Sequence, residues 1–123
     1  MHVLVVDDSK LARMAVAKLL NAIHPDWTRV EGANADEAVA LLKSAAPDLA
    51  VLDFNMPGRD GLALAAELLA IKPDLPVAII SANHQQEIVE QAHAVGATFL
   101  SKPITEAALR AFLAGVPRKA AST

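Results

Sequence analysis

The amino-terminal stretch of the chain reads His2-Val3-Leu4-Val5-Val6-Asp7-Asp8-Ser9. Its four consecutive aliphatic residues, Val3–Val6, form a short run without polar alternation, which is typical of a strand buried on both faces. Two carboxylates and a serine follow directly, and serine is a favoured N-cap residue for a helix. This stretch therefore predicts a buried strand, a polar loop and the start of a helix.

Further short apolar runs follow at intervals of about one βα unit. They are Thr28–Glu31, Leu49–Leu52, Val77–Ile80 and Thr98–Leu100. Helical patterns fill the segments between the runs, and strands that alternate with helices imply right-handed βαβ crossovers and a parallel sheet covered on both faces. We therefore expect an α/β fold of the (βα)5 type, a doubly wound parallel sheet in a three-layer sandwich like that of flavodoxin.

The first two helices can be placed from their capping residues. The first begins after its N-cap Ser9 and is expected to bury one apolar stripe. The members of this stripe are Ala12, Ala15, Val16, Leu19 and Ile23. Asn34 with Glu37 has the spacing of a capping box, which predicts a second helix that continues through Leu42.

Prolines, glycines and one threonine place the other helices. A third helix is expected from about Asp60 to Ile71, where Pro73 forbids its continuation. A fourth covers about Gln85–Val95 and stops at glycine 96, and Thr105 is the predicted N-cap of the fifth. The pattern predicts one domain, residues 1–115, followed by a short tail, residues 116–123.

The composition restricts the classes of function. The 123 residues carry 11 basic and 14 acidic side chains, a net charge of −3, and no basic cluster, which argues against direct binding to nucleic acid or to an anionic membrane. Apolar residues make up 54% of the chain, too many for a disordered protein. Without cysteine there can be no disulfide or thiolate metal site. No signal peptide or membrane span is visible, so we expect a cytoplasmic protein.

Polar side chains stand where the expected strands end. The first strand ends in Asp7 and Asp8, the third in Asp53 and the fourth in Ser81, and Lys102 follows the fifth. The carboxyl ends of parallel strands share one edge of the sheet, where three carboxylates repel one another unless a cation lies among them. Oxygen ligands suit Mg²⁺ or Mn²⁺. A lysine and a hydroxyl directed at the same point suit an anion such as a phosphoryl group.

Four motifs of this chain together resemble the receiver domains of two-component response regulators, the CheY-like proteins. The motifs are Val6-Asp7-Asp8-Ser9, Leu52-Asp53-Phe54-Asn55-Met56-Pro57-Gly58-Arg59-Asp60-Gly61, Ile80-Ser81-Ala82 and Lys102-Pro103. They occur in the family's order and spacing, and the likeness extends from Met1 to about Gly115. It implies a CheY-like fold and a module for signal transduction.

The resemblance implies that Asp53 is the phosphoacceptor. It would take a phosphoryl group from a phosphohistidine of a histidine kinase or a histidine phosphotransfer protein, forming an aspartyl phosphate. The resemblance also implies that Mg²⁺, for which Mn²⁺ can substitute, is held by Asp8, Asp53 and the backbone carbonyl of Asn55. Asp7 would act mainly through bound water. The only catalysis implied is the domain's own phosphorylation and dephosphorylation, so we do not expect an enzyme.

The resemblance further implies roles at the ends of the last two strands. Lys102 and Ser81 would contact the phosphoryl oxygens, and the peptide bond between Lys102 and Pro103 would be cis. In the family the serine hydroxyl moves toward the phosphoryl group and an aromatic side chain follows it, here Phe99. Many members carry a tyrosine at this place, so in this chain only the position of the ring can report the switch.

Partner surfaces follow less directly from the sequence. Leu11 and Met14 lie beside the expected stripe of the first helix, either in a docking patch for the phosphodonor or in flanking core packing. The output protein is unknown and is expected on the face of the fourth helix, fifth strand and fifth helix. Phe112 belongs either to that face or to the core. The histidines lack a metal-binding spacing and receive no role; they are His2, His24, His84 and His93.

Three alternatives remain at this point. A pseudo-receiver would bind partners without phosphorylation, and the chain could instead be the receiver fragment of a longer transcriptional regulator. A phosphohydrolase of the haloacid-dehalogenase type also uses an aspartyl phosphate, but it needs two aspartates separated by one residue, whereas Asp7 and Asp8 are adjacent. The pathway, whether chemotaxis, a phosphorelay or another, is open.

Overall fold

The computed structural model describes residues 1–56, 58, 60–82 and 86–115, in which five strands alternate with five helices. The strands are β1 (His2–Val6), β2 (Thr28–Gly32), β3 (Leu49–Asp53), β4 (Val77–Ser81) and β5 (Thr98–Ser101). The helices are α1 (Lys10–Ile23), α2 (Ala35–Ala45), α3 (Gly61–Ile71), α4 (Gln86–Ala94) and α5 (Glu106–Ala114). Each predicted apolar run lies within one strand, and no helix in these ranges is long and apolar enough to cross a membrane.

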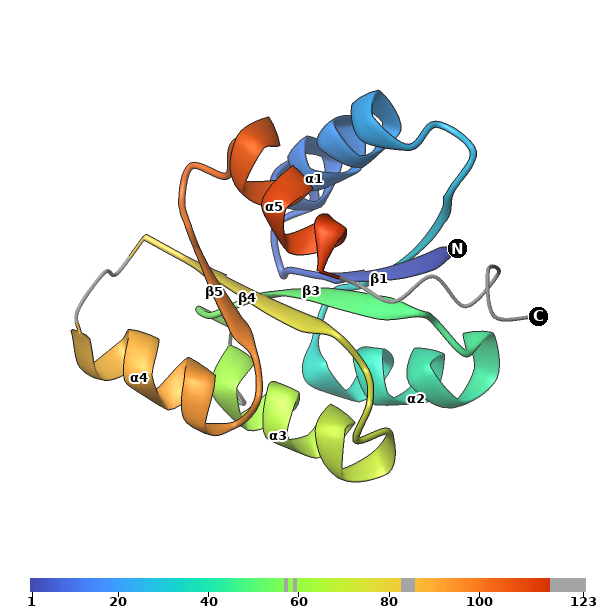
Figure 1. Cartoon of the computed structure of the whole chain (residues 1–123). Helices are drawn as coiled ribbons and strands as arrows, with labels where there is room; N and C mark the ends of the chain where they lie inside the picture. The colour runs from blue at the N-terminus through green and yellow to red at the C-terminus, as the bar shows by residue number, and fades with distance from the viewer. Residues whose placement is uncertain (57, 59, 83–85, 116–123) are drawn as a thin grey trace.

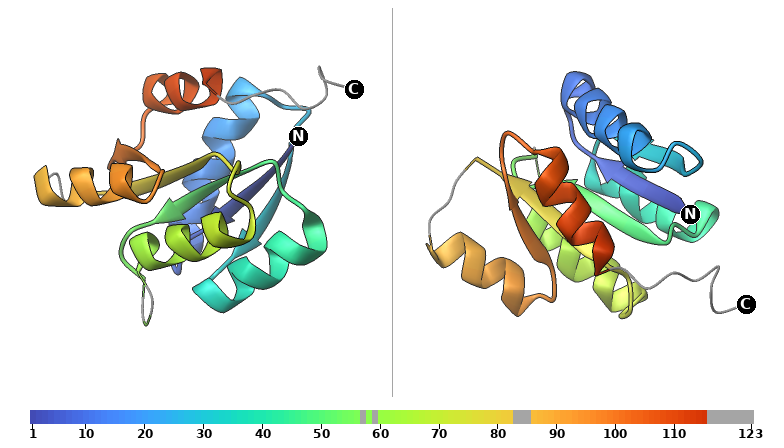
Figure 2. Two further views of the ribbon diagram at one scale, coloured as in Figure 1. Left: turned by 60° about the horizontal axis from the view of Figure 1, so that its bottom comes forward. Right: turned by 45° about the horizontal axis from the view of Figure 1, so that its top comes forward.

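All strands are parallel and form one sheet in the order β2-β1-β3-β4-β5. The helices α1 and α5 cover one face of this sheet, and α2, α3 and α4 cover the other (Figure 1). Figure 2 shows the same three layers from two further directions. The predicted doubly wound (βα)5 fold is therefore confirmed. The strand order reverses between β1 and β3, and ligands of such sheets bind beyond the carboxyl ends of the strands at this point.

The two faces of the sheet carry separate hydrophobic cores. Along β1, Val3 and Val5 pack with α1 and α5, whereas Leu4 and Val6 pack with α2 and α3. This alternation follows from the two-residue period of a strand. Both faces of β1, β3 and β4 are buried, which explains why their sequences are continuous apolar runs rather than alternating ones.

The predicted caps are confirmed. The side chains of Ser9, Asn34 and Thr105 accept hydrogen bonds from backbone N–H groups in the first turns of α1, α2 and α5, at 3.3, 2.9 and 3.1 Å. Glu37 accepts from the N–H of Ala33 at 2.9 Å, one residue before the N-cap N–H that a capping box uses. Helix α2 runs three residues beyond the predicted end at Leu42. The predicted start of the fourth helix at residue 85 and the tail, residues 116–123, lie outside the described residues.

The stripe predicted for the first helix is confirmed in part. Val16 is buried, and Leu19 and Ile23 pack against the core, but Ala15 is exposed. The buried side chains Ala17 and Leu20 lie outside the predicted stripe, because alanines and leucines occur on both sides of this helix and the apolar pattern alone does not fix the centre of the packed face. Phe112 is 9% exposed and packs in the core between the sheet and α5, which settles its two readings in favour of the core.

Candidate functional site

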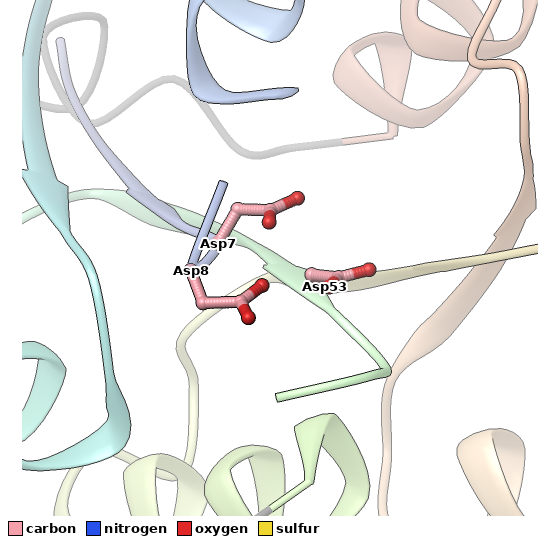
Figure 3. Close-up of side chains that lie close together, drawn as sticks. All are labelled: Asp7, Asp8 and Asp53. Carbon is pink, nitrogen blue, oxygen red and sulfur yellow. The ribbon is translucent and has the colours of Figure 1, made fainter. Parts of the chain in front are cut away.

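Three carboxylates meet at the carboxyl ends of the neighbouring strands β1 and β3. Ligand oxygens of Asp7, Asp8 and Asp53 all lie within 4.8 Å of one another, and Figure 3 shows the three side chains extending toward the same side. Asp7 and Asp53 are buried, and Asp8 is exposed. The prediction that these strand ends bring the carboxylates together is confirmed.

A lysine ammonium approaches the most buried of these carboxylates. Lys102 Nζ lies 2.7 Å from Asp53 Oδ1, and the Asp53 side chain is 4% exposed. Apart from this ion pair, Asp53 Oδ1 has no hydrogen-bond partner among the described residues. A carboxylate has about four lone-pair sites, so the ion pair with Lys102 leaves room for a second cation. The peptide bond between Lys102 and Pro103 is cis, as predicted.

The environment of Asp7 opposes its ionisation. Burial raises the pKa of Asp7, and the nearby charge of Asp53 and a hydrogen bond with Asp8 act in the same direction. A hydrogen bond from the N–H of Ser9 and the charge of Lys102 act against this rise. The net effect is a raised pKa of Asp7, with burial as its largest cause.

The loop that carries the acid pair is fixed by three polar contacts of Asp7. Its N–H donates to Gly32 of β2 at 3.1 Å, and its Oδ1 accepts from the N–H of Ser9 at 2.9 Å. Its carbonyl oxygen accepts from Arg13 Nη1 at 2.5 Å. This role of Arg13 was not predicted, because a contact to a backbone carbonyl leaves no mark in the residue pattern.

The other predicted site residues surround the same edge. Ser81 ends β4 and is 1% exposed, and its carbonyl accepts from the N–H of Lys102 at 2.9 Å. Phe99 of β5 is half-buried and packs against the core on the α2–α4 face. Asn55 is exposed two residues after Asp53. Pro57 and Arg59 of the second motif, and His84, lie outside the described residues.

An apolar groove of about 720 Å³ runs beside these carboxylates. It lies between α1 and the loop after β5, and Asp7 and Lys102 border it. On α1 itself, Leu11 is 78% and Met14 is 54% exposed, so the reading of these two side chains as flanking core packing is wrong. Leu11 and Met14 belong to the helix that borders this groove but do not line it.

Comparison with known proteins places these features in a family. Residues 3–114 match the response regulator receiver domain family. The chain is 39% identical over 108 residues to the positive alginate biosynthesis regulatory protein of Pseudomonas aeruginosa, covering 85% of this chain and 42% of that protein. It is 36% identical over 105 residues to the transcriptional regulatory protein PdtaR of Mycobacterium tuberculosis, covering 85% of this chain and 50% of that protein. This chain therefore spans about half the length, or less, of these two relatives.

Solved structures agree with this assignment. The chemotaxis protein CheY4 of Vibrio cholerae superposes with a TM-score of 0.84 at 28% identity, covering 94% of this chain and 98% of that one. CheY of Borrelia burgdorferi, solved in a complex with CheX, BeF3 and magnesium, superposes with a TM-score of 0.85 at 26% identity, covering 94% and 88%. With the family match, the fold and the acidic edge in agreement, the chain belongs to the receiver domains of response regulators.

Proposed function

We propose that this receiver domain is a phosphorylation-dependent switch in which Asp53 accepts a phosphoryl group. The observation that carries the proposal is the buried Asp53 carboxylate, paired with Lys102 at 2.7 Å and accompanied by two further carboxylates. A structural ion pair needs no additional acids around it, whereas phosphoryl transfer depends on a nucleophile, a cation and a compensating charge held at one point. The family match over residues 3–114 supports a domain that spans residues 1–115.

In this proposal a carboxylate oxygen of Asp53 attacks the phosphorus of a phosphohistidine on the donor protein. A P–O bond forms while the P–N bond breaks, and the electron pair of that bond stays on the imidazole nitrogen of the donor. The Lys102 ammonium compensates negative charge on the transferred group, and the Ser81 hydroxyl donates to one of its oxygens. The products are an aspartyl phosphate and an unphosphorylated donor histidine.

The donor set fits a divalent cation. The buried Asp53 carboxylate lies beside those of Asp7 and Asp8, and hard oxygen ligands of this kind suit Mg²⁺, or Mn²⁺ in its place. We assign Asp8, Asp53 and the backbone carbonyl of Asn55 as ligands, with Asp7 acting through bound water. When bound, the cation supplies the remaining positive charge that the incoming phosphoryl group requires.

The switch is proposed to pass through Ser81 and Phe99. Ile79 of β4 is in register with Phe99 of β5, so Ser81 and Phe99 lie diagonally on the same face of the sheet, the face covered by α4. A movement of the serine hydroxyl toward the phosphoryl group opens space that the phenyl ring can enter. Because Phe99 has no hydroxyl, the position of its ring is the only signal that it gives to a partner.

We propose that the donor docks on α1. Leu11 and Met14 are the exposed large apolar side chains of this helix, and the groove beside it opens at Asp7 and Lys102. An apolar helix surface on the donor could cover both features and bring its phosphohistidine to Asp53. If Leu11→Ser leaves the rate of transfer from the cognate donor unchanged, this surface is not the docking site.

The output partner is proposed to bind the face formed by α4, β5 and α5, where Phe99 lies. Phe112 is buried beneath α5, so it supports this face from within and does not form its surface. The partner is either a separate protein or a further domain of a longer transcriptional regulator. The second arrangement is proposed because the matched region covers only 42% and 50% of the two relatives.

The first test is covalent phosphorylation, measured as intact mass after incubation with Mg²⁺ and acetyl phosphate. We expect the native protein to gain one phosphoryl group and Asp53→Asn to gain none. Asp74→Asn is the matched control, since Asp74 is an exposed aspartate outside the site, and it should be phosphorylated like the native protein. Omission of Mg²⁺ should abolish the adduct.

Rapid hydrolysis of the aspartyl phosphate must be distinguished from a failure of Asp53 to react with the phosphodonor. Titration with beryllofluoride and Mg²⁺, followed by amide chemical shifts near Ser81 and Lys102, detects the phosphorylated conformation without a labile bond. If neither the adduct nor these shifts appear in the native protein, the pseudo-receiver reading replaces the proposed function.

A further inference from the structure

We propose that Arg13 is a positioning residue for the acid pair, whose guanidinium holds the peptide between Asp7 and Asp8 and thereby sets the affinity of the site for its cation. The proposal rests on the metal-dependent function above. It assigns to the arginine no contact with the phosphoryl group or with the cation. Its action is through the backbone that presents the two carboxylates.

Arg13 makes two polar contacts from the first turn of α1. Its Nη1 donates to the carbonyl oxygen of Asp7 at 2.5 Å, and its Nε donates to Glu31 Oε1 of β2 at 3.1 Å. The Arg13 side chain is 15% exposed. Because two different nitrogens of a planar group are engaged, the orientation of the whole guanidinium is fixed, which a single contact could not achieve.

The contact matters because the hydrogen bond of the Asp8 side chain with Asp7 lies inside the acid pair, so the pair must be held from outside. Asp7 is buried and held through its N–H and its carboxylate, whereas Asp8 is exposed. The peptide unit between them is planar, so a bond to its carbonyl oxygen also fixes the direction in which the Asp8 backbone continues. The starting point of the Asp8 side chain, a proposed ligand, is thereby set by Arg13.

The charge of Arg13 and its positioning role predict opposite changes in cation affinity when Arg13 is replaced. A positive charge close to three carboxylates weakens their attraction for another cation, so removal of the charge alone would tighten cation binding. Loss of an outer contact that orients a ligand instead weakens binding, by about 10-fold or more in metal sites. The pairing of Arg13 with Glu31 at 3.1 Å already compensates part of the arginine charge, which favours the second effect.

The experiment is a calorimetric titration of the full chain with Mg²⁺ alone, for the native protein and for Arg13→Met. We expect the variant to bind Mg²⁺ about 10-fold more weakly. Arg13→Lys keeps the charge but cannot bridge both partners, so its affinity should also fall. The control is Arg110→Met, which removes an exposed arginine from an ion pair on α5 and should leave the affinity unchanged.

A second readout separates positioning from general damage. Urea unfolding shows whether each variant is folded, and the rate of phosphorylation by acetyl phosphate should return to the native value at saturating Mg²⁺ if only cation affinity has changed. Unchanged or tighter Mg²⁺ binding by folded Arg13→Met, or by Arg13→Lys if the first variant fails to fold, overturns the inference. Failure of the native protein to bind Mg²⁺ would overturn the metal-dependent function itself, and this inference with it.

Discussion

Asp53 is buried and yet accessible from one direction. A buried carboxylate is costly unless it is paired, and the cost is several kcal/mol per ion. Lys102 provides the pairing at 2.7 Å while its own side chain remains 34% exposed, so the pair reaches solvent on the lysine side. A residue in this environment is held in one position and can still meet a reagent that arrives beyond the ends of the strands.

Among the glycines of this chain, Gly61 has the least room for a side chain, and it lies against Asp53. A Cβ at this position would lie 2.5 Å from the carbonyl oxygen of Asp53 and 2.9 Å from the Cα of Phe54. We expect Gly61→Ala to lower the free energy of unfolding by about 2 kcal/mol or more, because backbone atoms must move to accept the methyl group. The displaced segment carries Asp53, so phosphorylation by acetyl phosphate should also slow.

Chemical denaturation in urea measures the first effect and intact mass over time the second. Gly115→Ala is the control, since its Cβ would come no closer than 3.6 Å to another atom. A Gly61→Ala protein with native stability would show that the loop after β3 yields without cost.

The site residues divide into those that sequence can reveal and those that it cannot. Asp7, Asp8, Asp53, Ser81 and Lys102 are visible because each follows an apolar run, and the ends of parallel strands share one edge. The contact of Arg13 with a backbone carbonyl is invisible in the sequence, because it depends on the loop geometry and on no particular residue type in its partner.

At the scale of the elements, α2 ends in an unfavourable backbone conformation. Its C-cap residue, Ala46, has a φ of 48° and lies in the left-handed region, where a Cβ costs about 1 kcal/mol and glycine pays no such cost. We therefore expect Ala46→Gly to raise the free energy of unfolding by about 0.5–1 kcal/mol.

The comparison is with Ala45→Gly, one residue earlier and still within α2. That change should lower stability by up to about 1 kcal/mol, because glycine disfavours the helical conformation. Urea unfolding curves of the two variants should therefore shift in opposite directions, and a shift in the same direction would contradict this account of the C-cap.

The strands were predictable within one residue at each end, whereas the packed face of α1 was predictable only in part. Apolar strand runs are bounded by charged or turn residues, so their limits are clear. In α1 the side chains of Ala12, Ala15, Ala17, Leu19 and Leu20 surround much of the helix. Alanine is compatible with burial and with exposure, so the pattern could not show that Ala17 is buried and Ala15 exposed.

At the scale of the whole molecule, the acid cluster makes stability dependent on pH. The pKa of Asp7 is raised in the folded protein, chiefly by burial. Between its unfolded and its folded pKa, the native state binds more protons than the unfolded state, so stability falls as the pH rises through this window. Above the folded pKa the full penalty for the buried charge is present.

We therefore expect Asp7→Asn to be more stable than the native protein at neutral pH in the presence of a chelator. The advantage should shrink as the pH is lowered through the folded pKa, where Asp7 becomes protonated. Urea unfolding at several pH values checks this, with the exposed Asp74→Asn as control. An Asn variant that is less stable than the native protein at neutral pH without metal would contradict the assigned penalty.

The two cores described above divide the molecule into two compartments. The alternation along β1 and β3 that sends Val5 and Val51 toward α1 and α5 places Asp7 and Asp53 on that side, whereas Phe99 packs on the other. A donor seated on α1 would therefore lie on one face of the sheet, and a partner that contacts α4 and Phe99 on the other. The proposed output face also includes α5, which packs beside α1 on the donor's side. Substitutions on α4 should then alter output binding alone, whereas substitutions on α5 should affect both partners.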